Sequence, residues 1–118
     1  MDSQVEHIRS LYSQLQGIPE LLSDNNDIVI LNAKSKYLRI ARELISSAQE
    51  YFGELPESVM LNSDKGRIMN LIEHTNFSYD KKGNVSFKSI KEMEKIMNDG
   101  IDTLGRHIID KFNNEEDK

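Results

Sequence analysis

One pair of residues in the sequence has types that could carry out catalysis together. Arg67 and His74 are seven positions apart. Arginine can bind an anionic group, and histidine can act as a general base. Both residue types are common and the spacing is permissive, so the pair by itself does not predict a catalytic site.

The pair is similar to the loose arginine-histidine pattern of HEPN-type helical ribonucleases. Ile68 is apolar, however, where that family usually carries a polar residue, so we do not assign the family. The three histidines lack partners at a metal-binding spacing, and no paired carboxylates, phosphate-binding glycine loop or cysteine is present. The sequence therefore predicts a protein that is not an enzyme and that uses no metal and no cofactor.

The bulk composition favours one small acidic domain. The chain has 118 residues, two prolines and a formal charge of −5, which favours solubility and a basic partner over nucleic acid. It shows no signal peptide and no apolar stretch near the ~20 residues that span a bilayer. We expect a cytoplasmic protein with no membrane contact. Abundant Ile, Asn and Lys with little Ala indicate a bacterial or phage origin.

Hydrophobic periodicity predicts two helices in the first half of the chain. Ser3 and Glu6 have the spacing of a capping box before a helix over about residues 4–16, which Gly17 ends. After a further turn at 19–22 and a polar cluster, a long amphipathic segment extends to Phe52. Its start is ambiguous, because residues 28–31 also have the composition of a short buried strand.

The middle of the chain predicts a short helix and then a β-hairpin. A helix capped at Ser63 or Asp64 should end near His74. Apolar residues then alternate with serines over 77–79 and 85–87, on both sides of the loop 80–84, which is typical of a hairpin. We therefore expect a mainly α fold, a small bundle of four to five helices with one short β-hairpin before a long C-terminal helix.

The last helix, opened by a second capping box at Ser89 and Glu92, carries the strongest apolar stripe. The stripe begins at Ile90 and ends at Phe112, which sets the domain at 1–112 and leaves 113–118 as a disordered charged tail. Gly100 and Gly105 flank it, and close backbone approach by a neighbour is one explanation for these two glycines. We expect core along most of its length and a homodimer contact in its C-terminal part, through Met97, Ile101, Leu104, Ile108 and Phe112.

By elimination, these features favour a non-catalytic regulatory or adaptor module that binds another protein through its helical faces. The alternative is a winged-helix-like DNA-binding regulator that dimerises through its C-terminal helix. In that arrangement the segment 64–74 would enter the major groove and the hairpin tip would touch the backbone. The residues expected to contact nucleic acid are Lys65, Arg67, Lys81 and Lys82.

Overall fold

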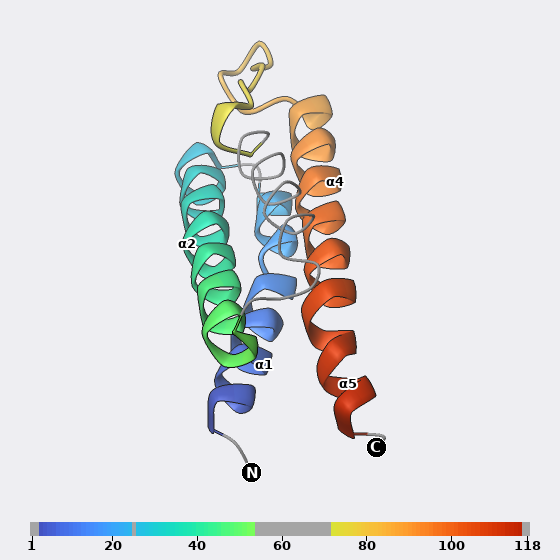
Figure 1. Ribbon diagram of the computed structural model, residues 1–118. Coiled ribbons are helices and arrows are strands. Elements are labelled where there is room, and N and C mark those ends of the chain that lie inside the picture. The colour runs from blue at the N-terminus through green and yellow to red at the C-terminus, as the bar shows by residue number, and fades with distance from the viewer. Residues whose placement is uncertain (1–2, 25, 54–71, 117–118) are drawn as a thin grey trace.

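The computed structural model describes residues 3–24, 26–53 and 72–116, and these are mainly helical. Figure 1 shows α1, α2 and α4 side by side, with α1 antiparallel to the other two and α5 continuing the line of α4. The elements in chain order are α1 (Ser3–Gln16), the 3-10 helix η1 (Pro19–Asp24), α2 (Asp27–Phe52), α4 (Phe87–Leu104), the π-helical turn η2 (Gly105–Ile109) and α5 (Asp110–Glu116).

The two ends of this arrangement differ in what they contain. The upper end, as oriented in Figure 1, carries η1, the first turns of α2 and α4, and residues 75–86 between them. The lower end carries the start of α1, the end of α2 and all of α5, so Ser3 and Glu116 lie at the same end. We use the terms upper end and lower end in this sense below.

The core is built from the apolar stripes expected from the sequence. Every residue of the C-terminal stripe is buried, with no side chain more than 8% exposed. The ambiguous start of α2 is helical, and the Asn26 side chain caps it by accepting hydrogen bonds from the backbone N–H groups of Ile28 and Val29. The principal core residues of α1 and α2 are Ile8, Leu11, Leu15, Ile30, Ala33, Tyr37, Ile40, Ala41, Leu44, Ile45 and Ala48.

The predicted β-hairpin is absent from the described residues. A single antiparallel bridge joins Tyr79 to Val85, and a tight turn closes the loop between them. The Asp80 carboxylate accepts hydrogen bonds from the backbone N–H groups of Lys82 and Asn84, and Gly83 has a positive φ of 83°. The second strand cannot extend, because the residues after Val85 already cap and begin α4.

Helix α4 begins earlier than the capping box at Ser89 predicted. Ser86 is the N-cap, and its hydroxyl accepts a hydrogen bond from the backbone N–H of Ser89. Ser89 is instead a buried side chain within the first turn, and its hydroxyl oxygen accepts from the Ser78 backbone N–H at 2.8 Å. Phe87, expected in a strand, is therefore the first residue of the helix.

The other end of this helical run also differs from expectation. Helix α5 continues through Glu116, although the sequence led us to expect a disordered tail from residue 113. One contact helps to hold the extension, because Arg9 Nη2 donates a hydrogen bond to Asn113 Oδ1 at 3.3 Å. The predicted helix capped at Ser63 or Asp64 lies outside the described residues, except for a helical turn over 72–74 whose Ile72 is buried.

Two tyrosine hydroxyls connect α1 and α2 to the backbone of α4. Tyr37, fully buried, donates a hydrogen bond to the Met97 carbonyl oxygen at 2.7 Å. Tyr12 donates to the Ile101 carbonyl oxygen at 3.2 Å. The two accepting carbonyls are one helical turn apart, so these bonds fix the height of α4 against both neighbouring helices.

A close contact with the Tyr12 side chain explains why residue 105 is a glycine. Gly105 is also the residue at which the helix widens into the π-helical turn. A Cβ atom built on Gly105 would lie 2.5 Å from the Tyr12 hydroxyl oxygen. The helix forms its π turn from this residue, and the Asp110 N–H donates back five residues to the Gly105 carbonyl. A neighbour therefore approaches Gly105 closely, but it is a side chain and not the backbone that the sequence led us to expect.

We predict that Tyr37→Phe lowers the free energy of unfolding by about 1 kcal/mol, because it deletes a buried hydrogen bond while keeping the ring in the core. Urea denaturation followed by circular dichroism measures the change. Tyr79→Phe is the matched control, since the Tyr79 side chain is exposed and should leave the midpoint unchanged. Equal midpoints for wild type and Tyr37→Phe would contradict the prediction.

We also predict that Gly105→Ala lowers the free energy of unfolding by about 1–3 kcal/mol, because the added methyl group overlaps the Tyr12 hydroxyl. The loss should shrink in a Tyr12→Phe background, where that oxygen is gone, and a double-mutant cycle measures the coupling. Gly17→Ala is the control, since its Cβ would meet only an ordinary contact at 3.6 Å. Additive effects of the two changes would refute the proposed contact.

Candidate functional site

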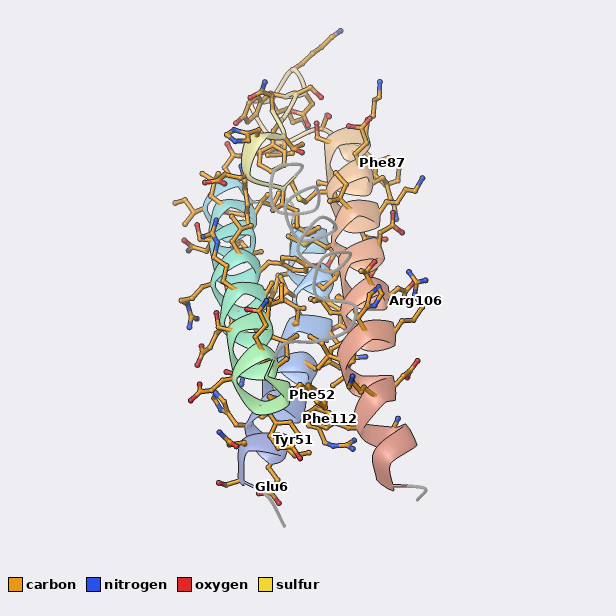
Figure 2. The ribbon with its side chains drawn as sticks, in the orientation of Figure 1. Glu6, Tyr51, Phe52, Phe87, Arg106 and Phe112 are labelled. Carbon is orange, nitrogen blue, oxygen red and sulfur yellow. The ribbon has the colours of Figure 1, made fainter. Side chains whose placement is uncertain are left out.

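Large exposed apolar side chains gather at the upper end. Phe87, the first residue of α4, is 74% exposed, and Figure 2 shows it at this end of the molecule. Ile28, in the first turn of α2, is 70% exposed. The exposed large hydrophobic residues of the described chain lie in η1, the first two turns of α2, the segment 75–86 and the first turn of α4, all at the upper end; they are Leu21, Ile28, Leu31, Tyr79 and Phe87.

At the lower end, by contrast, the aromatic side chains pack against one another. Tyr51 and Phe52 at the end of α2 pack on Phe112 of α5, with ring centroids 5.3 Å and 4.9 Å from the Phe112 ring. Cationic side chains cover this cluster, with the Arg9 guanidinium 5.7 Å from the Phe112 ring and the Lys111 ammonium 5.2 Å from the Phe52 ring. Figure 2 shows the three labelled rings gathered between the helices.

A pocket of about 360 Å³ opens at the upper end between η1, the 80–84 turn and α4. Buried side chains of Leu22, Val85 and Ile90 supply its apolar floor, and the exposed Phe87 ring stands beside them. Its polar lining consists of Ser23, Asp80, Lys91 and Glu94. We call these eight residues the upper pocket. Its apolar floor with a charged rim suits a protruding apolar side chain.

Three serines hold the wall of the upper pocket in place. The hydroxyl oxygens of Ser78 and Ser89 are 2.9 Å apart, and the Ser86 hydroxyl donates to Ser89 Oγ at 3.2 Å. The Ser86 backbone N–H donates to the Ser78 carbonyl oxygen at 2.8 Å. Because these bonds join the segment before the turn to the first turn of α4, they fix Val85 and Phe87 relative to each other.

The ionisable groups with shifted pKa values are two tyrosines whose hydroxyls bond to the backbone of α4. Burial raises the pKa of the Tyr37 hydroxyl well above its ordinary value, and the nearby Tyr12 and Asp99 add to the effect. Burial also raises the pKa of Tyr12, helped by the negative charges of Asp102 and Asp110. In the described part of the chain, no three His, Asp or Glu side chains come together in a way that could hold a metal ion.

The structure does not bring the predicted contact residues together as an open surface. The five tentative dimer residues, Met97, Ile101, Leu104, Ile108 and Phe112, are buried inside the single chain. Of the residues expected to touch nucleic acid, Lys81 and Lys82 are exposed on the turn, whereas Lys65 and Arg67 lie outside the described residues. His74 is exposed at the end of the helical turn over 72–74, and its partner Arg67 again lies outside the described residues.

Sequence reasoning missed the upper pocket because it placed Phe87 in a strand with its ring packed inward. The sequence does contain a signal for the earlier helix start. Ser86 precedes an apolar residue and is as suitable an N-cap residue as Ser89. Leu22 and Val85 come from separate segments, and periodicity within either segment does not show that they meet.

No family model, curated protein or solved structure gives a significant match to the chain. None of the described helices is long and apolar enough to cross a membrane.

We predict that alkaline pH destabilises the fold through the two raised tyrosine pKa values. In the unfolded chain a tyrosine ionises near pH 10, whereas Tyr12 and Tyr37 stay protonated to higher pH in the folded protein. Their contribution to stability is therefore complete below about pH 10 and is lost as the pH rises above it.

Tyrosinate absorbance near 295 nm, recorded against pH, tests this prediction. Part of the absorbance change in the folded protein should occur at higher pH than in the same chain in concentrated urea. Tyr37→Phe should remove some of the change that occurs at this higher pH. Superimposable curves for the folded and unfolded chain would rule out the proposed burial of the hydroxyls.

Proposed function

We propose that the protein is a non-catalytic regulatory or adaptor module that binds another protein through its upper end. The observation that supports this most directly is that the large exposed apolar side chains of the described residues occur at the upper end, where one of them, Phe87, lines a pocket with an apolar floor. Removing apolar surface from water gains roughly 25 cal/mol per Å². Exposed apolar surfaces therefore commonly mark interaction sites.

The distribution of apolar residues strengthens the proposal. The stripes of α1, α2 and α4 are already buried against one another, so the core does not need Phe87, Ile28 or Leu31. An exposed aromatic ring beside a pocket is also the residue type that contributes most at protein interfaces. The upper end therefore has the composition of a binding surface, whereas the rings of the lower end are buried or half-buried, and Phe52 and Phe112 already contact cations.

The homodimer expected from the sequence stays a prediction, with a constraint from the structure. Its five tentative contact residues are buried within one chain, so a dimer of the folded protein would have to use other surfaces. The DNA-binding alternative gains no support from the described residues, where the wing it needs is a turn closed by one bridge. A cytoplasmic, bacterial or phage setting likewise remains part of this proposal.

Phe87→Asp tests the proposed function. The wild-type chain should retain a partner protein in stoichiometric amount from the lysate of its native cell, and Phe87→Asp should weaken that retention at least tenfold, on the order of the 1.4 kcal/mol that a central aromatic contact provides. Because the ring is 74% exposed, the substitution should leave the unfolding midpoint nearly unchanged.

Ser46→Asp is the matched control, since it adds the same charge at an exposed position of α2 outside the upper pocket. It should retain the partner as the wild type does. Equal retention by Phe87→Asp would refute binding through the upper end. Recovery of DNA, with affinity that falls steeply as salt rises, would favour the DNA-binding alternative instead.

A further inference from the structure

The lining of the upper pocket indicates what kind of segment it can accept. Leu22, Val85 and Ile90 contribute no hydrogen-bonding side-chain group to its floor, so a polar group inserted there would lose its water without compensation. A volume of about 360 Å³ lies within the size of sites that hold a small ligand or a side chain. The floor therefore selects for one large apolar side chain.

The rim of the upper pocket carries an excess of negative charge. Two carboxylates, Asp80 on the turn and Glu94 on α4, line it together with one ammonium group, that of Lys91. Lys91 Nζ lies 3.8 Å from Glu94 Oε1 and 5.3 Å from the centre of the Phe87 ring, so these two groups already engage its charge. Lys81 and Lys82 do not line the pocket.

The position of Asp80 is fixed before any partner arrives. Its Oδ1 atom accepts hydrogen bonds from the N–H groups of Lys82 at 2.8 Å and Asn84 at 3.0 Å. These bonds hold the carboxylate against the turn at the edge of the pocket. A preorganised carboxylate binds a cation with little loss of side-chain freedom, which favours a cationic group placed next to an inserted apolar side chain.

We propose that the upper pocket binds a short peptide segment in which one large apolar side chain is flanked by lysine or arginine. The apolar side chain would fill the floor beside Phe87, and the cation would contact Asp80 and Glu94. The net charge of −5 on the chain attracts such a segment and disfavours a second copy of the same chain as the occupant. This inference rests on the proposed function and specifies the chemistry of the partner.

Three synthetic peptides test the inference by fluorescence anisotropy. One carries a central phenylalanine flanked by lysines, the second replaces the lysines by glutamates, and the third keeps the lysines but replaces phenylalanine by serine. The first should bind, and the other two should each bind about tenfold more weakly or worse. Shifts of the Val85, Phe87 and Ile90 amide resonances should place the first peptide in the upper pocket.

Charge-neutralising variants separate this site from a general attraction to an acidic protein. Asp80→Asn keeps an acceptor for the turn, and Glu94→Gln keeps the side-chain length; each should weaken the lysine-flanked peptide by about threefold. Glu92→Gln is the control, because it removes the same charge from α4 at an exposed position outside the upper pocket. It should leave the affinity unchanged.

Equal affinity for the lysine-flanked and glutamate-flanked peptides would overturn the proposed chemistry, as would an equal effect of Glu92→Gln. Failure of every peptide to shift the pocket resonances would overturn it too. The retention test with Phe87→Asp decides the proposed function independently. A partner lost on Phe87→Asp, combined with any of these failures, would leave protein binding established and this inference rejected.

Discussion

The arrangement of the helices depends on two hydroxyl groups that reach across the core to the backbone of α4. Apolar stripes bring the helices together, but hydrophobic burial is non-directional and does not by itself favour one precise alignment. Hydrogen bonds from Tyr37 to Met97 and from Tyr12 to Ile101 remove that freedom. The upper pocket depends on the result, because its walls come from η1, the turn and α4, and its shape exists only when α4 is held at one height.

Much of the fold could be predicted because long helices leave a periodic record in the sequence. The stripes of α2 and of the last helix are buried as expected. The hairpin failed for a local reason: alternation around 77–79 and 85–87 resembles strands, yet Ser86 has a stronger use as the N-cap of α4. The π turn was not predicted: it begins at Gly105, where the Tyr12 side chain of another helix approaches closely.

The candidate site was harder to predict than the fold. Sequence reasoning expected core along most of the last helix and a dimer contact in its C-terminal part, whereas the stripe is buried within the single chain along its whole length. The upper pocket combines Leu22 with Val85 and Ile90, which the fold brings together from distant parts of the chain. Phe112 could be assigned to the core from its place on the apolar stripe, whereas a single exposed phenylalanine such as Phe87 has no periodic signature.

The placement of the two termini has a practical and biological consequence. Ser3 and Glu116 both lie at the pole of the molecule farthest from Phe87 (Figure 1 and Figure 2). A tether, a fused domain or a solid support attached at either terminus would therefore leave the opposite pole facing outward. A molecule anchored in this way would still expose its upper end to a partner.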